Sequence, residues 1–201
     1  NMANASLDMF ENTSDPKYLL FATNLANYLI AHFWDESTYG FFFTSDNHEK
    51  LIIRPKNNYD LSMPSGNSVA AHVLLRLHYI TQDKQFFETT KKIIESQAIS
   101  AAENPFAFGY LLNVLYLYYQ KPTEITIIND KNFELVSSLR KKFLPESIMV
   151  LVKNEKDLAA LSKYAFFSGK EFQQNKTNVF VCKNFSCSLP LSNLSEIEKE
   201  L

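Results

Sequence analysis

Polar side chains gather just before a helix predicted to start after residue 65. In the stretch RPKNNYDLSMPSGNSVAAH, residues 54–72, hydrogen-bond donors and acceptors precede an otherwise apolar run. Ser65 suits an N-cap, and the exposed amides at a helix start can bind an anion or a ligand oxygen. Such groups can orient a polyol, a carboxylate or a phosphate. The residues that we expect to bind this ligand are Arg54, Lys56, Asp60, Ser65 and Asn67.

The same five side chains have a structural alternative. Ser65 would then only cap its helix, and Asn67 would satisfy buried backbone groups. Asp60 would pair with Arg54 or Lys56 and fix the loop. Their concentration at one helix start favours a ligand site. If these five side chains point into one open pocket, the arrangement supports ligand binding. If they use all their hydrogen bonds on one another and on the backbone, it supports the structural role.

Two adjacent carboxylates, Asp35 and Glu36, follow the sole tryptophan, Trp34. Glycoside hydrolysis uses one carboxyl group as an acid and another as a base or nucleophile, but the two must flank the sugar. We therefore expect turn or capping roles for this pair, with a catalytic role as the alternative. For Trp34 we expect core packing, with stacking on a sugar ring as the alternative. The catalytic residues, if the protein is an enzyme, stay unassigned.

The sequence lacks the patterns typical of metal and cofactor sites. It contains no helical HExxH, Gly-rich phosphate loop, serine elbow or CxxC pair. We therefore predict no metal and no cofactor. His72 lies one turn into the helix after Ser65, where a satisfied polar residue on a helix face is the favoured interpretation.

Two cysteines, Cys182 and Cys187, are too few for a disulfide framework or a four-ligand zinc site. Thioredoxin-type redox pairs have two intervening residues, so this wider spacing is weak support for exchange chemistry. We expect reduced thiols in a cytosolic setting, and a single bridge is the alternative.

The composition indicates a globular protein without a nucleic-acid or membrane signature. Hydrophobic residues make up 46% of the 201 residues, and only 4 are glycine, which favours helices over a turn-rich sandwich. The net charge of −2 and the lack of a long basic run argue against nucleic acid. Because no apolar run spans a bilayer and no export signal opens the chain, we predict a cytoplasmic protein.

Apolar residues at helical spacing predict two helical hairpins, in residues 1–33 and 65–97. In the first, NTSDP supplies a turn, an N-cap and a proline at the first helical position. Shifting this hairpin by 68 positions aligns it with the second, for example Thr13 with Thr81. The match indicates a structural repeat whose apolar stripes need stacked neighbours.

A change of period divides the chain near Pro122. Before it, the run between Phe106 and Tyr119 is apolar nearly all round, which predicts burial on more than one side. After it, the strands EITIIN, SIMVLV and NVFVC alternate with the helices FELVSSLRKKFL and EKDLAALSKYA. This order predicts a short parallel β-α-β-α-β unit. We place the domains at residues 1–121 and 122–201.

A long connection, residues 33–63, joins the two hairpins. Long ordered connections often carry function. Its aromatic part, Tyr39 to Thr44, is expected to pair with Leu51 to Arg54 as a small ribbon.

Several of these motifs resemble the YyaL family, whose members have an N-terminal thioredoxin-like domain followed by a helical toroid related to six-hairpin glycosidases and N-acylglucosamine 2-epimerases. The motifs are RPKNNYDLSMPSGNSVAA, VCKNFSCSLPLSN, TSDPKYL, FWDE, GFFFT and EITIIN, which together span nearly the whole chain. The resemblance implies the C-terminal part of such a protein, without its thioredoxin-like domain. The implied fold is mainly α with a small α/β tail: a partial α/α toroid, its pocket at the loops entering the inner helices, those starting near Met2 and Ser65.

Two residues depart from the family pattern, Asn57 at an acidic position and Leu61 at a glycine position. The family has no settled reaction. We therefore expect a carbohydrate-type or small polar-ligand pocket with Arg54, Lys56 and Asp60 as orienting groups. The alternative is a non-catalytic module that supports a thioredoxin-like domain or a protein partner. A partial toroid also predicts exposed apolar faces and self-association.

Overall fold

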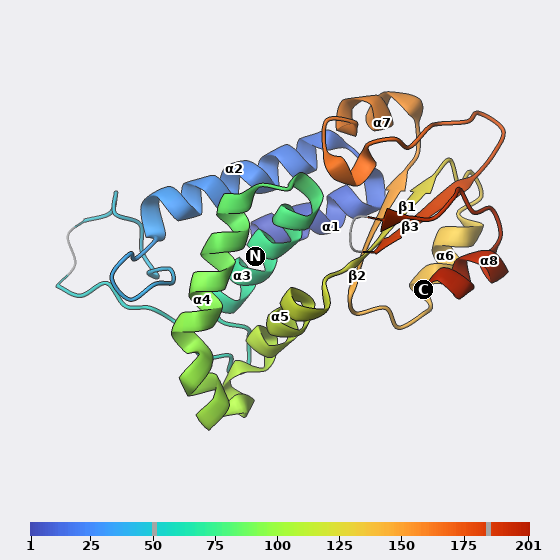
Figure 1. Cartoon of the computed structure of the whole chain (residues 1–201). Helices are drawn as coiled ribbons and strands as arrows, with labels where there is room; N and C mark the ends of the chain where they lie inside the picture. Colours follow the sequence, from blue (N-terminus) through green and yellow to red (C-terminus); the bar gives the residue numbers. More distant parts are fainter. Residues whose placement is uncertain (50–51, 184–185) are drawn as a thin grey trace. The chain divides into compact units, whose positions relative to one another are not determined.

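The structure is a computed structural model and describes residues 1–49, 52–183 and 186–201 (Figure 1). The first helices are α1 (Met2–Thr13), α2 (Pro16–Phe33), α3 (Gly66–Thr81), α4 (Lys84–Glu103), the 3-10 turn η1 (Pro105–Phe108) and α5 (Gly109–Gln120). The remaining elements are β1 (Thr123–Ile128), α6 (Glu134–Arg140), β2 (Ser147–Val152), α7 (Glu155–Leu161), the 3-10 turn η2 (Ala165–Phe167), β3 (Asn178–Lys183), β4 (Ser186–Cys187) and α8 (Leu194–Glu200). This order confirms the predicted fold class, mainly α with a small α/β part.

Packing groups the chain into two compact units. The first comprises Asn1–Ala5 and Leu20–Tyr119, and the second comprises Ser6–Leu19 and Gln120–Leu201. The turn of the first hairpin is thus grouped with the α/β part, where Phe10 meets Phe167 edge to face with 6.1 Å between ring centroids. The domain division at residues 1–121 and 122–201 stays a prediction.

The two hairpins repeat the same turn, 68 positions apart, in Thr13–Asp15 and Thr81–Asp83. In both turns the threonine Oγ1 donates to the carbonyl four residues earlier at 2.7 Å and accepts the aspartate amide at 3.3 Å. The middle residue is left-handed in both, with φ of 57° and 62°. Each aspartate then accepts the amide two residues on, at 3.0 and 2.9 Å. This shared geometry supports the internal repeat.

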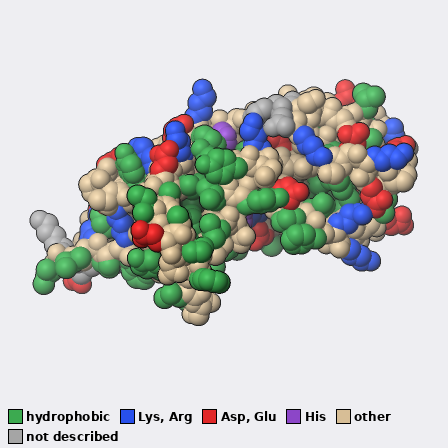
Figure 2. Space-filling view, turned by 60° about the horizontal axis from the view of Figure 1, so that its bottom comes forward, with side chains coloured by type: hydrophobic (Ala, Val, Ile, Leu, Met, Phe, Trp, Pro, Cys, Tyr) green, Lys and Arg blue, Asp and Glu red, His purple; other side chains and the backbone are tan. Residues whose placement is uncertain are grey.

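Helix α5 is buried along one stripe only. Leu111, Val114 and Leu117 are spaced three apart and face the core. Phe106 and Tyr119 are 96% and 71% exposed, so the prediction of burial on more than one side is wrong. An all-round apolar sequence permits such burial, but a packing neighbour has to supply it. Figure 2 shows hydrophobic side chains gathered on the face that is turned forward, where α5 lies.

The sheet has the strand order β2-β1-β3-β4. Strands β1 and β2 are parallel, as predicted, but β3 runs antiparallel to β1, so the fully parallel unit is wrong. The physical reason is the return path. The segment after η2 brings the chain back to the carboxyl end of β1, where Asn178 pairs with Ile128, and an antiparallel neighbour needs no crossover.

One face of the sheet packs on short helices. Ile125 and Ile127 of β1 and Val181 of β3 form an apolar core with Leu139 of α6 and Ile197 of α8. All five side chains are at most 3% exposed. Alternation along the strands places the next residues on the opposite face.

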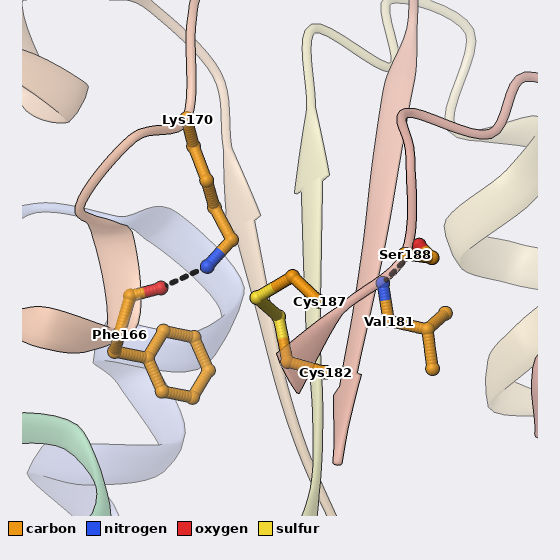
Figure 3. Close-up of a disulfide and its surroundings, with 6 residues drawn as sticks. All are labelled: Phe166, Lys170, Val181, Cys182, Cys187 and Ser188. Carbon is orange, nitrogen blue, oxygen red and sulfur yellow. Dashed lines mark hydrogen bonds between the residues drawn. A yellow bond between two sulfur atoms is a disulfide. The ribbon is translucent and has the colours of Figure 1, made fainter. Parts of the chain in front are cut away.

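Cys182 and Cys187 form a disulfide (Figure 3), so the expectation of two reduced thiols is wrong for this structure. The register of β3 and β4 sets the two residues directly opposite each other, with 3.9 Å between their Cα atoms. Opposed residues of neighbouring antiparallel strands point to the same face, which brings the two sulfurs together. Among the helices that the structure describes, none is long and apolar enough to cross a membrane.

Candidate functional site

Asp60 joins the starts of two helices. Its Oδ1 accepts the amide of Ser65, the N-cap of α3, at 2.7 Å. Its Oδ2 accepts the amides of Tyr110 and Leu111, in the first turn of α5, at 2.8 and 3.0 Å. The residue is only 8% exposed. Since helix starts carry partial positive charge and free amides, this one carboxylate caps α3 and α5 together.

Ser65 is the predicted N-cap and is fully buried. Its extended backbone, φ −66° and ψ 153°, lets Oγ accept the amide of Ser68 at 3.0 Å. The same Oγ lies 2.8 Å from the Ser68 hydroxyl. Its hydroxyl thus serves the helix start itself.

Asn67, 1% exposed, ties the first turn of α3 to the long connection. Its Oδ1 accepts the amide of Phe41 at 2.6 Å. Its Nδ2 lies 3.0 Å from each of three acceptors, the carbonyls of Phe41 and Asn57 and the Oδ1 of Asn58. Both the oxygen and the nitrogen of the Asn67 side-chain amide are therefore hydrogen-bonded within the chain.

Gly40 allows this close approach. It has φ of +86°, which side chains rarely tolerate, and a Cβ placed there would lie 3.0 Å from the Asn67 Oδ1. Gly40 thus permits the left-handed turn before Phe41 and leaves room for the Asn67 side chain, which binds the Phe41 backbone.

Arg54 and Lys56 fasten the other end of the connection. An Nη of Arg54 donates to the carbonyls of His32 and Thr44 at 3.2 and 2.6 Å. The guanidinium carbon lies 4.2 Å from the centre of the Phe42 ring, a cation–π distance. The Nε of Arg54 is buried and has no hydrogen-bond partner among the described residues.

Lys56 forms an ion pair with Asp35, at 2.5 Å between Nζ and Oδ2. Its Nζ also donates to the Thr38 hydroxyl and the Tyr39 carbonyl, both at 2.6 Å. The hydrogen bond from Lys56, followed by one from Ser37, holds the pKa of Asp35 well below its usual range. The Lys56 ammonium group therefore binds to the turn formed by residues 35–39.

The pair Asp35 and Glu36 is divided between different partners. Asp35 accepts the Ser37 amide and hydroxyl at 2.9 and 2.6 Å, which fixes the turn. Glu36 lies 3.4 Å from the Nζ of Lys92 in an exposed pair. The turn role expected for Asp35 is thus seen.

The predicted ribbon pairs farther along the chain than expected. Isolated antiparallel bridges join Trp34 with Phe41 and Phe42 with Lys56, and the Phe43 amide donates to the Pro55 carbonyl at 2.8 Å. Residue 51 of the expected partner segment lies outside the described residues.

The five predicted residues thus lie in one connected region without converging on a shared opening. A cavity of about 410 Å³ lies nearby, at the start of α3. Its walls include Phe33, Phe41, Leu25 and Val73, and of the five predicted residues only Asn67 lines it. This cavity is mainly apolar, as ligand pockets usually are.

The sequence analysis identified the polar residues of this region, but it did not identify the groups to which they are hydrogen-bonded. The α5 amides that Asp60 caps are fifty positions downstream, so no local signal points to them. His72 likewise has a distant partner, the Tyr110 hydroxyl, 2.7 Å from its Nδ1. In the ranges that the structure describes, no group of three His, Cys, Asp or Glu side chains is placed to hold a metal ion.

Comparisons with known proteins extend over nearly all of the chain. No protein-family model matches it. It is 26% identical over 200 residues to human spermatogenesis-associated protein 20 and 24% identical to the mouse protein, covering 97% of this chain and 25% of each relative. An uncharacterized protein of Caenorhabditis elegans is 26% identical over 201 residues, which is 27% of that protein. The chain is thus similar to about a quarter of the length of these relatives.

Proposed function

We propose that this chain is a non-catalytic structural module of a YyaL-type protein, a part of an α/α toroid that supports a thioredoxin-like domain or a protein partner. The repeated hairpins agree with stacked toroid units. The relatives named spermatogenesis-associated protein 20 are about four times as long as the matched region, which leaves room for further domains in them.

The saturation of Asp60 is the observation that carries this proposal. A ligand-orienting carboxylate needs free acceptor capacity, whereas Asp60 already accepts three backbone amides and is almost fully buried. Asn67 and Lys56 are likewise bound to the connection. We call the five residues Arg54, Lys56, Asp60, Ser65 and Asn67 the polar entrance of α3. In this proposal the polar entrance is a brace that fixes the connection between α2 and α3 to the starts of α3 and α5.

A ligand panel tests the proposal. We would measure thermal unfolding of the unmutated chain, Asp60→Ala and Asn67→Ala with sugars and sugar phosphates. The structural role predicts that both variants are less stable and that no panel member stabilises the unmutated chain. A true ligand at 100 times its Kd would add about 2.7 kcal/mol to its unfolding free energy.

The second candidate function is a carbohydrate-type pocket, and the cavity at the α3 start favours it. Its aromatic wall, with Phe33 and Phe41, offers flat surfaces for a sugar ring. A panel member that stabilises the unmutated chain but not a folded Asn67→Ala variant would assign this function and refute the purely structural role.

Two further properties stay proposals. The exposed apolar side chains of α5, with Phe106 beside them, would support self-association, which sedimentation at increasing concentration tests. The second is the cytoplasmic location, a compartment in which stable structural disulfides are rare, so the Cys182–Cys187 bond would there have to be a reducible one. Localisation of the tagged protein in cells checks it.

A further inference from the structure

Three residues form one row across the sheet. Glu124 of β1 pairs with Cys182 of β3, and Cys182 pairs with Cys187 of β4. Directly opposed residues share a face, so a carboxyl group, a buried sulfur and a second sulfur follow one another. Cys182 is 1% exposed, whereas Cys187 is exposed on the short edge strand β4. The disulfide therefore has one accessible end and one protected end.

A hollow of about 290 Å³ opens beside Cys187. Lys170, Asn178 and Phe180 line it together with Cys187. Figure 3 shows the Lys170 side chain extending on one side of the disulfide toward the Phe166 carbonyl, to which its Nζ donates. The hollow thus places the accessible sulfur near the basic side chain of Lys170, and the acidic Glu171 also lines it.

Two polar groups around this face are incompletely satisfied. Asn178 is 2% exposed, and its Oδ1 has no hydrogen-bond partner in the part of the chain that the structure describes. The same holds for Thr126 Oγ1, on the strand position opposite Phe180. Buried polar atoms without hydrogen-bond partners are uncommon in folded proteins, and these two lie on the same face of the sheet as the disulfide.

Glu124 and Lys170 have opposite charges on this face. Burial raises the pKa of Glu124 to about 6, and the attraction of Lys170 opposes that rise. Burial lowers the pKa of Lys170, which Glu124 partly restores. Glu124 can therefore exchange a proton near neutral pH, beside Cys182.

We propose that Cys182–Cys187 is a thiol–disulfide exchange site for a dithiol reductant, with Glu124 as the proton-transfer group for Cys182. A thiolate of the dithiol attacks the accessible Sγ of Cys187, the S–S bond breaks, and the electron pair leaves on Cys182, which takes a proton from Glu124. The second thiol of the reductant then loses its proton and attacks the mixed disulfide. Cys187 leaves as a thiolate and is protonated, so one dithiol is oxidised as one disulfide is reduced.

Lys170 assists the accessible end. A positive group beside a sulfur favours its thiolate, and the Lys170 side chain lines the hollow into which Cys187 is exposed. The site differs from the polar entrance of α3 and does not depend on the function proposed there.

Single-cysteine variants of the full chain test which end reacts. Cys182→Ser keeps Cys187, and Cys187→Ser keeps Cys182. With oxidised glutathione, the Cys187 thiol is expected to form a mixed disulfide at least about tenfold faster than the Cys182 thiol, because access limits the reaction. Equal rates, or faster reaction of Cys182, would overturn the proposal. In the unmutated chain, after brief reduction, an alkylating reagent should likewise modify Cys187 before Cys182.

The proton-transfer role has a separate readout. We would follow reduction of the native chain by dithiothreitol from pH 5 to 8, divided by the rate for free glutathione disulfide to remove the reductant's own titration. The rate for the unmutated chain should fall as the pH rises through about 6, where Glu124 loses its proton. Glu124→Gln should lack this fall and react about tenfold more slowly below pH 6. Glu200→Gln, an exposed control, should match the unmutated chain. Reduction only under denaturing conditions, or identical profiles for all three, would leave a purely structural disulfide and refute the proposal.

Discussion

Replacing Asp60 with alanine should destabilise the protein more than the loss of an ordinary helix cap. The change removes three hydrogen bonds to backbone amides, two of them at the start of α5 and one at the N-cap of α3. Losing an N-cap costs about 1 kcal/mol, and a hydrogen bond to a charged group contributes about 1.5–3 kcal/mol. Water can reach some of the freed amides, so we expect a loss of about 3–5 kcal/mol rather than the full sum. This is a large part of a typical unfolding free energy of about 5–15 kcal/mol.

Urea denaturation followed by circular dichroism measures this loss. Asp83→Ala is the matched control, because Asp83 caps α4 through a single amide at 2.9 Å from a more exposed position, and it should cost about 1 kcal/mol. Asp60→Asn keeps one acceptor oxygen and should fall between the two. If Asp60→Ala cost no more than Asp83→Ala, the double cap would not contribute as the geometry implies, and the brace would lose its main support.

Further predictions concern a glycine, a carboxyl group and an amide. Gly40→Ala should cost about 1–2 kcal/mol, because its φ is +86° and the new Cβ would press on Asn67, whereas Gly66→Ala, with open space around it, should be neutral or stabilise by up to about 1 kcal/mol; thermal unfolding of both variants checks the contrast. The pKa of Glu124 is raised from 4.5 to about 6 in the folded state, so its contribution to stability is fully present below pH 4.5 and is lost as the pH rises through 6. The unfolding free energy of Glu124→Gln minus that of the unmutated chain should therefore rise by about 1–2 kcal/mol between pH 4 and 7, allowing for partial solvent exposure, and a flat difference would contradict the assigned burial. Asn67→Ala should increase amide hydrogen exchange at Phe41, whose amide it holds at 2.6 Å, without changing exchange in β1.

Local chemistry made much of the fold predictable. The proline and aspartate of NTSDP start α2 at Pro16, and Ser65 caps α3 at the expected residue. The alignment of Thr13 with Thr81 extends to the same turn hydrogen bonds. These features depend on neighbours within four residues, which a sequence displays directly.

Distant partners account for the errors. The direction of β3 depends on where the segment after η2 returns, and the exposure of Phe106 depends on which neighbours are present. The bond between Cys182 and Cys187 follows from strand register, which their spacing alone does not specify. For the polar entrance, the residue types were compatible with both interpretations, and only the partners of Asp60 favour the structural one.

The double cap has a consequence for local motion. Ser65, Tyr110 and Leu111 donate their amides to one side chain although they lie in segments far apart in the sequence. When Asp60 swings away, all three amides lose their acceptor in the same event. The N-terminal ends of α3 and α5 should therefore open together as one cooperative unit. The amides of Ser65, Tyr110 and Leu111 would then share one opening rate in hydrogen exchange.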